Sequence, residues 1–304
     1  MVSGQLFDSQ WWARSVGACG LGLGLVTPAA FAQMDVDATD TTSRETTPDL
    51  VAEDFESDDE PKISGTFGID YNTHFVSYGF DVWGAGTEFW EDNTLNPYVE
   101  LGLDFDRFSV TAGIWFDIND NAAASIGGDI QEVDFYYGVS TGYEDFTFGV
   151  TYQHWHYGGG VEQVLDLDIG YDDSGLWGDE DFALNPSFRY HDRLASSNIG
   201  GDSNGAAFLF GIEPALDLIQ SEEYPVGVSI PVTVAFGTDD FYADSGYAYL
   251  SVGAQFSVPL EFIDTAYGEW SLGAGLTFYQ TDEDAIGNAD DNFLTGNIGV
   301  SVGF

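Results

Sequence analysis

The chain has almost no cysteine and very few basic residues. Cys19 is its only cysteine among 304 residues, and Cys19 lies in an N-terminal apolar run. The rest of the chain can therefore form neither a disulfide framework nor a thiolate metal site. Six Lys and Arg stand against 52 Asp and Glu, a formal net charge of −46 at pH 7. A surface of this charge repels nucleic acid and attracts cations, so we expect no nucleic-acid partner.

Long apolar runs are also missing, except near the N-terminus. Arg14 is followed by "SVGACGLGLGLVTPAAFA", which ends in a small-x-small pattern, and then by acidic residues. This order predicts a secretory signal peptide over residues 1–32, cleaved after Ala32. A lipoprotein with Cys19 as lipid acceptor is the alternative, but a lipobox follows the apolar run, whereas most of this run follows Cys19.

Residues 33–61 lack both basic charge and periodicity. They contain eleven Asp or Glu and one Arg, which predicts an acidic disordered linker. After residue 32 the sequence has no apolar run long enough to cross a bilayer as a helix, and no stripe with a helical period.

What is present from residue 62 onward is alternation of apolar and polar residues. Clusters of Asp, Asn, Gly and Ser interrupt it about every twenty residues. The pattern predicts twelve strands: 63–74, 95–105, 107–118, 130–142, 145–157, 161–171, 182–190, 206–217, 226–237, 246–257, 268–279 and 293–304. Most are longer than the usual five or six residues and close to the length that crosses a bilayer at a tilt.

The connections indicate how these strands are arranged. Those after strands one, three, seven, nine and eleven are mostly long and polar, including "HDRLASSNIGGDSNG" after strand seven. Tight turns are predicted at Asp106-Arg107 and Tyr143-Glu144; a short "GGG" at 158–160 and a long "VPLEFIDTAYG" are exceptions. The alternation predicts an all-β fold, a transmembrane antiparallel up-and-down barrel of about 12 strands over 62–304, with long loops outside and both ends in the periplasm.

Alternate residues divide into two faces. In "PYVELGLDF", Val99, Leu101 and Leu103 oppose Glu100 and Asp104. A secreted sandwich or jelly roll would show the same alternation, with its apolar face in the core. The signal peptide, the even number of long strands, the aromatic residues near strand ends and the scarcity of Lys favour the barrel in an outer membrane.

The last strand carries a resemblance to a known class. Ile298, Val300, Val302 and Phe304 occupy alternate positions up to the last residue. This resembles the C-terminal strand signal of Gram-negative outer-membrane β-barrel proteins, which implies recognition by the barrel-assembly machinery. The stretches "YNTHFVSYGFDVWG", "NPYVELGLDF" and "FSVTAGIWF" are similar to TorF-type putative porins, which usually carry Arg-Gly where this chain has Tyr78-Gly79.

With the apolar face toward lipid, an acidic lumen is predicted. The residues of this cation pathway would be Asp70, Glu100, Asp104, Asp117, Glu132, Asp134, Asp166, Asp168, Glu213 and Glu269, with Arg189 as the main base. Carboxylates in a narrow sleeve concentrate cations. We therefore predict a porin-like channel for passive, cation-favouring passage of ions or small solutes. The alternative is a structural or surface-interaction barrel whose lumen is plugged by loops. Its acidic composition would then reflect a saline habitat and not ion selectivity.

An enzyme acting on lipid or protein is the third hypothesis. His74, His154, His156 and His191 all fall near the outer ends of strands, but no serine follows at a His-x-Ser spacing, and an interfacial position explains His154 and His156 more simply. We predict no catalytic residue and no cofactor.

A dedicated metal site is not predicted either, because an EF-hand-like series from Asp117 meets Ala122 where glycine is needed. The expected partners are outer-membrane lipid and lipopolysaccharide, with at most loosely bound divalent cations that bridge lipopolysaccharide phosphates.

Overall fold

The computed structural model describes residues 61–84, 88–121, 125–177, 182–196, 205–221 and 225–304. The predicted signal peptide and, Pro61 aside, the predicted linker lie outside these residues.

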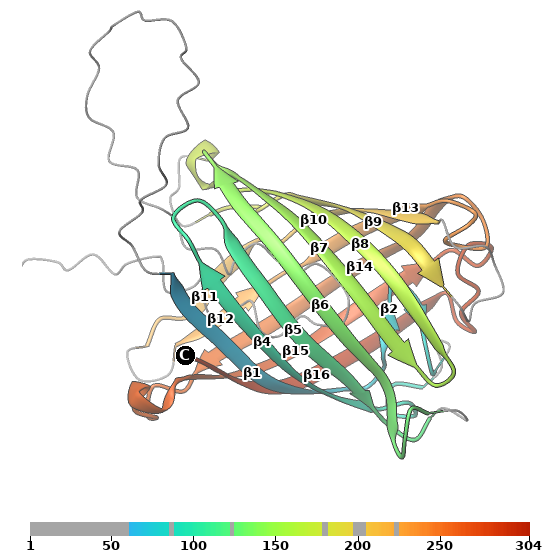
Figure 1. Ribbon diagram of the computed structural model, residues 1–304, viewed down its shortest axis with the longest axis horizontal. Coiled ribbons are helices and arrows are strands. Elements are labelled where there is room, and N and C mark those ends of the chain that lie inside the picture. The colour runs from blue at the N-terminus through green and yellow to red at the C-terminus, as the bar shows by residue number, and fades with distance from the viewer. Residues whose placement is uncertain (1–60, 85–87, 122–124, 178–181, 197–204, 222–224) are drawn as a thin grey trace, which may run out of the picture.

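A closed antiparallel barrel of twelve strands forms the described part of the chain. Its segments are β1 (Lys62–Asn72), β4 (Thr94–Asp104), β5 (Ser109–Ile118), β6 (Ile130–Tyr143), β7 (Phe146–Tyr157), β8 (Gly160–Tyr171), β9 (Ser187–Ser196), β10 (Ala206–Ile212), β11 (Ala215–Ile219), β12 (Val226–Ser229), β13 (Val232–Gly237), β14 (Gly246–Pro259), β15 (Glu269–Thr281) and β16 (Asn292–Gly303). The last strand, β16, pairs with β1 and closes the sheet (Figure 1). Closure confirms the predicted all-β barrel and excludes a sandwich.

Two of the twelve strands are interrupted by proline. β10 and β11 are separated at Glu213-Pro214, and β12 and β13 at Ile230-Pro231. Proline has no N–H to donate to a ladder. The proline carbonyl can still accept a hydrogen bond. The Ile230 N–H donates to the Pro214 carbonyl at 2.9 Å, and the Gly253 N–H donates to the Pro231 carbonyl at 2.8 Å. Pairing therefore continues across the breaks, and fourteen segments make twelve strands.

The predicted seventh strand is wrong in position. The sequence predicts it at 182–190, but β9 spans Ser187–Ser196, so the first six residues of the expected loop "HDRLASSNIGGDSNG" are strand. Two polar residues of this stretch are interior residues paired with β8, because His191 faces Asp166 in the register and Arg193 forms an ion pair with Glu162. This part of β9 is thus paired through charged residues inside the barrel, and it lacks the alternation of apolar residues from which a strand is predicted.

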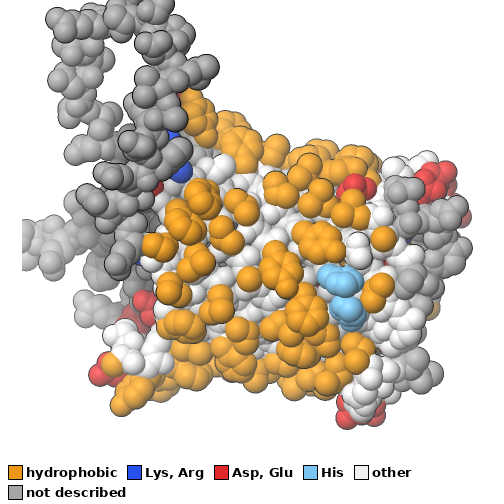
Figure 2. Space-filling model, in the orientation of Figure 1, with side chains coloured by type: hydrophobic (Ala, Val, Ile, Leu, Met, Phe, Trp, Pro, Cys, Tyr) orange, Lys and Arg blue, Asp and Glu red, His pale blue; other side chains and the backbone are white. Residues whose placement is uncertain are grey.

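The outer wall is apolar and the inner wall is polar or small. Large side chains such as Leu101, Val150 and Ile298 are 49%, 48% and 58% exposed, and hydrophobic side chains cover the visible outer wall (Figure 2). The alternating residues point inward, among them Thr94, Asn96 and Tyr98 on β4, and are buried. This is the arrangement expected when lipid rather than a protein core covers the apolar face.

The two ends of the barrel differ. Both Lys62 and Phe304 lie at one end, here called the terminal end (Figure 1). The predicted tight turns are confirmed there: β4 leads to β5 around Asp106-Arg107, and Glu144, at a φ of 52°, joins β6 to β7. The opposite end, here called the far end, carries the connection between β1 and β4. Among the described residues, no helix is long and apolar enough to span a membrane.

Candidate functional site in the barrel interior

The connection between β1 and β4 folds back into the barrel at its far end. Its Phe75–Val82 segment forms a hairpin, here called the hairpin, with β2 (Val76–Ser77) paired to β3 (Phe80–Asp81). The turn consists of Tyr78 and Gly79, with φ of 49° and 87°. Positive φ at both central residues is the two-residue geometry that matches strand twist, and Gly79 adopts it without a Cβ penalty. Tyr78 at the tip is only 3% exposed.

Residues from two other far-end connections hold the hairpin turn. The Tyr242 hydroxyl donates to the Tyr78 carbonyl at 3.0 Å, and the Asn288 side-chain amide donates to the Gly79 carbonyl at 2.8 Å. The Asn288 side-chain oxygen also accepts from the Asp81 N–H at 3.1 Å. Asn288 therefore satisfies two backbone groups of the hairpin, the carbonyl of the turn residue Gly79 and the N–H of Asp81 in β3.

Side chains fill the far half of the interior around the hairpin. One buried cluster comprises Tyr78, Trp155, Val164, Ala207, Leu209, Ala235, Phe241, Tyr242, Ala248, Tyr249, Ala285 and Ile286. A second comprises Phe75, Tyr98, Trp115 and Tyr136, with Trp83 packed against it. Every residue in these two sets except Trp83 is at most 8% exposed. Large aromatic side chains therefore fill much of the far half of the interior.

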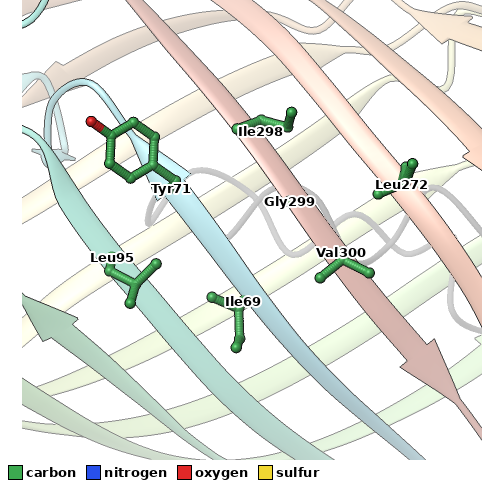
Figure 3. Close-up of a pocket in the computed structure, with 7 residues that line it drawn as sticks. All are labelled: Ile69, Tyr71, Leu95, Leu272, Ile298, Gly299 and Val300. Carbon is green, nitrogen blue, oxygen red and sulfur yellow. The ribbon is translucent and has the colours of Figure 1, made fainter.

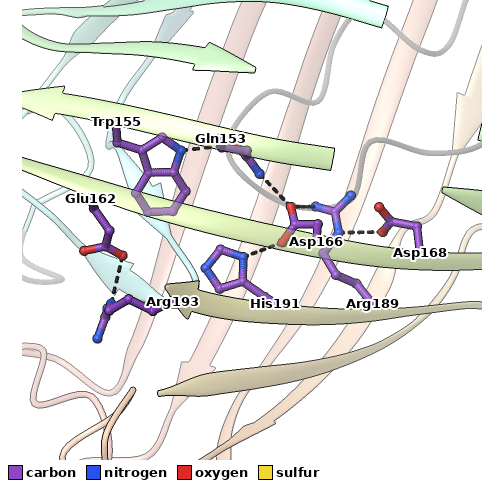
Figure 4. A network of polar contacts seen from close by, with 8 residues as sticks. All are labelled: Gln153, Trp155, Glu162, Asp166, Asp168, Arg189, His191 and Arg193. Carbon is purple, nitrogen blue, oxygen red and sulfur yellow. Dashed lines mark hydrogen bonds and ion pairs between the residues drawn. The ribbon is translucent and has the colours of Figure 1, made fainter. Parts of the chain in front are cut away.

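A ladder of opposite charges joins β8 to β9 on the inner wall (Figure 4). Arg189 Nε lies 2.6 Å from Asp168 Oδ1, and its Nη1 lies 3.8 Å from Asp166 Oδ2. The His191 Nδ1 atom lies 2.6 Å from Asp166 Oδ1. These buried charges are paired and hydrogen-bonded, which is the condition for keeping them out of water.

The ladder continues at the far end and contacts the hairpin. Arg193 Nε lies 2.8 Å from Glu162 Oε1, and the Arg193 guanidinium sits 4.4 Å from the Phe241 ring centroid. The Tyr78 ring lies 3.8 Å from the His191 ring, centroid to centroid. The tip of the hairpin therefore rests on the middle of the ladder.

Other interior acids have no basic partner among the described side chains. Asp117 is fully buried and accepts hydrogen bonds from Trp83, Asn119 and, among further side chains, Thr94. Glu132 and Asp134, 5% and 2% exposed, share a hydrogen bond with each other. Among the described side chains, no Lys or Arg forms an ion pair with these three acids.

The remaining predicted acids lie toward the terminal end or beside the seam. Glu100 accepts from the Tyr136 hydroxyl at 3.1 Å and Glu213 from the Ser229 hydroxyl at 2.8 Å, and both are half-buried. Asp104 and Glu269 are exposed near the terminal end, whereas Asp70 is buried where β1 meets β16. The ten predicted acids thus do not form one cluster, and their role as a cation pathway stays a prediction.

Sequence reasoning missed three parts of this interior. His191 and Arg193 were placed in a loop, although Arg189, His191 and Arg193 alternate as one face of a strand does. The hairpin was also missed, and the only local signal was Tyr78-Gly79 between apolar residues. Nothing local marked Asn288 as its partner, because the two positions are more than two hundred residues apart.

The four histidines separate into two pairs. His74 and His191 are buried and paired with Asp81 and Asp166. The other pair, His154 and His156, lies on the outer wall as predicted from parity, with ring centroids 4.2 Å apart. Among the described residues, no group of three or more His, Cys, Asp or Glu is arranged to hold a metal ion. Asp117, the first residue of the EF-hand-like series, is occupied by hydrogen bonds within the protein.

The closing seam exposes the predicted assembly signal. Ile298 and Phe304 are 58% and 70% exposed on the outer wall, and Phe304 exchanges two backbone hydrogen bonds of 3.0 Å with Gly65 of β1. Their recognition by an assembly machinery stays a prediction. A groove of about 220 Å³ crosses the outer wall here, lined by Ile69, Tyr71, Leu95, Leu272, Ile298, Gly299 and Val300 (Figure 3). It faces outward and gives no entry to the interior.

Comparisons with known proteins find similarity of structure only. No protein-family model matches the chain, and no curated relative matches it. A bacterial polysaccharide outer membrane secretin is similar at 9% identity and a TM-score of 0.47, covering 79% of this chain and 97% of its own. An outer membrane channel from Pseudomonas putida F1 is similar at 13% identity and a TM-score of 0.45, covering 86% of this chain and 100% of its own.

These likenesses are distant, so the class follows from the chain's own features. A closed barrel of twelve antiparallel strands with an apolar outer wall and a polar inner wall is the fold of outer-membrane β-barrel proteins.

Proposed function

We propose that this barrel is a passive channel that passes small cations in preference to anions, and that the hairpin closes its far end in the present conformation. The observation that carries the proposal is the excess of interior carboxylates without a basic partner. We also propose that the terminal end faces the periplasm, because the predicted signal peptide directs export and short turns lie on the periplasmic side of such barrels.

The charge balance of the inner wall supports cation preference. On the described part of the inner wall, Arg189 and Arg193 are the two Arg residues, and each is paired with an acid of β8. These pairs leave the following acids uncompensated: Asp70, Glu100, Asp117, Glu132, Asp134 and Glu213. Glu132 and Asp134 share a proton in their mutual hydrogen bond, so this pair carries at most one charge. In a narrow passage with low-dielectric walls, the charges of such acids reinforce one another and favour cations.

Planar-bilayer recording tests the proposal. We expect discrete openings whose reversal potential in a KCl gradient favours K⁺, and a weaker preference after Glu100→Gln together with Glu213→Gln. Asp192→Asn is a matched control, because Asp192 alternates with the interior residues of β9 and faces outward. Unchanged selectivity in the double variant would mean that these acids do not line the conducting path.

A barrel without conductance is the second candidate, and the packed far half favours it. Removing residues 76–81 distinguishes the two functions. A correctly folded barrel that still conducts no ions after this deletion would overturn the channel. A hydrolase remains the third hypothesis, and loss of a lipase or protease activity on changing His154 and His156 to Ala would be its signature.

A further inference from the structure

Two histidine side chains lie next to each other on the outside of the barrel. His154 and His156 alternate on β7, and their ring centroids are 4.2 Å apart with an angle of 53° between the ring planes. Figure 2 shows histidine side chains together on the outer wall toward the far end. They are these two, because His74 and His191 are 4% and 0% exposed. Both rings are therefore open to ligands from outside.

The chemistry of this pair is that of a metal ligand. Neither ring forms an ion pair in the part of the chain that the structure describes, in contrast to His74 and His191. Two neutral imidazoles on one side of a strand offer nitrogen donors, which suit Cu²⁺, Ni²⁺ and Zn²⁺. Gln163 lies opposite His154 in the register of β7 and β8 and faces the same way, so its amide oxygen is a further donor near the rings.

The spacing of the rings can be compared with that of two imidazoles on one metal ion. With metal–nitrogen bonds of about 2.0–2.1 Å, two imidazole centroids lie about 4.5 Å apart at a right-angled metal and about 5.2 Å apart at a tetrahedral one. The separation of 4.2 Å in the structure is nearer the right-angled value. Square-planar and tetragonal nitrogen sites are typical of Cu²⁺ and Ni²⁺, whereas Zn²⁺ prefers tetrahedral sites.

We propose that His154 and His156 form a two-imidazole binding site for Cu²⁺ or Ni²⁺ on the outer wall near the far end, completed by water. Because only two protein ligands are required, the site is compatible with the absence of a group of three or more ligands among the described residues. It is independent of conduction, since the rings face away from the interior.

Cu²⁺ titration of the full, untagged chain folded in detergent tests the site. We expect one Cu²⁺ per chain above any background, with an electron paramagnetic resonance spectrum showing two imidazole nitrogens. His154→Ala and His156→Ala should each weaken binding at least tenfold, and Ni²⁺ should bind more weakly than Cu²⁺. Binding should also weaken in acid, because a protonated imidazole has no free nitrogen lone pair for the metal.

Two controls separate the site from loose binding to this acidic chain. Val161→Ala removes the side chain opposite His156 without removing a donor, and it should bind Cu²⁺ as the unchanged chain does. The double variant lacking both imidazoles gives the background. Equal affinity in this double variant and the unchanged chain, or a spectrum with one nitrogen in the unchanged chain, would overturn the proposal.

Discussion

Replacing Asn288 by alanine should loosen the hairpin without damaging the barrel. Asn288 donates to the Gly79 carbonyl at 2.8 Å and accepts from the Asp81 N–H at 3.1 Å. A hydrogen bond contributes about 0.5–1.5 kcal/mol net, so losing both should cost the closed state about 1–3 kcal/mol. At about 1.4 kcal/mol per factor of ten, the population with a displaced hairpin should rise roughly 5- to 150-fold.

Two measurements report this change. The open probability of single channels should rise in Asn288→Ala, and a cysteine introduced at Ser77 in a Cys19→Ser background should react faster with a thiol reagent. The second measurement does not depend on conduction. Asp290→Ala is the matched control, because Asp290 lies in the same connection and is exposed. If the cysteine reacts no faster in Asn288→Ala than in the control, these two hydrogen bonds do not hold the hairpin in place.

Three further predictions concern stability and assembly. Arg189→Met should lower the free energy of unfolding in lipid vesicles by about 3–5 kcal/mol, because it removes the cation paired with Asp168 and with the buried Asp166; the exposed Arg107→Met should change it little, and equal effects would contradict the ladder. Burial would raise the pKa of Asp173, but hydrogen bonds from Trp177 and the backbone of Asn185 and Leu184 outweigh it and lower this pKa below its ordinary value of 3.8. Ionised Asp173 therefore stabilises the folded state above about pH 4, and this stabilisation is lost as the pH falls through the lowered pKa. Asp173→Asn should accordingly be less stable than the unchanged chain at pH 7 and equally stable at low pH. Deleting Phe304 should reduce the amount of barrel in the outer membrane of cells while leaving refolding in detergent unchanged, and a normal cellular amount would contradict its role as an assembly signal.

The outer wall could be predicted from the sequence because its chemistry is uniform. Every strand presents apolar residues at alternate positions to the same solvent, so Leu101 and Val150 follow one rule, and the twelve strands with most of their bounds could be placed. The interior follows no such rule. Whether Arg193 belongs to a loop or to a strand depends on Glu162 of the neighbouring strand, and a single sequence does not display this pairing.

The position of the hairpin is even harder to predict from a single sequence. Tyr78-Gly79 favours a tight turn, but the turn is compatible with a loop that extends into water. Its place inside the barrel depends on Tyr242 and Asn288, which come from connections far along the chain. Contacts between distant segments that involve one or two residues leave no periodic pattern, so neither the hairpin nor its partners could be predicted.

The contacts also indicate which part of the molecule would move in the opening of the proposed channel. Each wall strand is held on both sides by continuous ladders, and the seam between β1 and β16 alone pairs seven residues of each strand. Three hydrogen bonds join the hairpin to the loops around it: Tyr242 and Asn288 each donate one, and Asn288 accepts one. The Tyr78 ring also packs on His191 of β9. The regions that open at least cost are those with the fewest such contacts. Displacement of the hairpin is therefore much less costly than any rearrangement of the wall, and it would uncover the β8–β9 ladder first, because the Tyr78 ring lies directly on it.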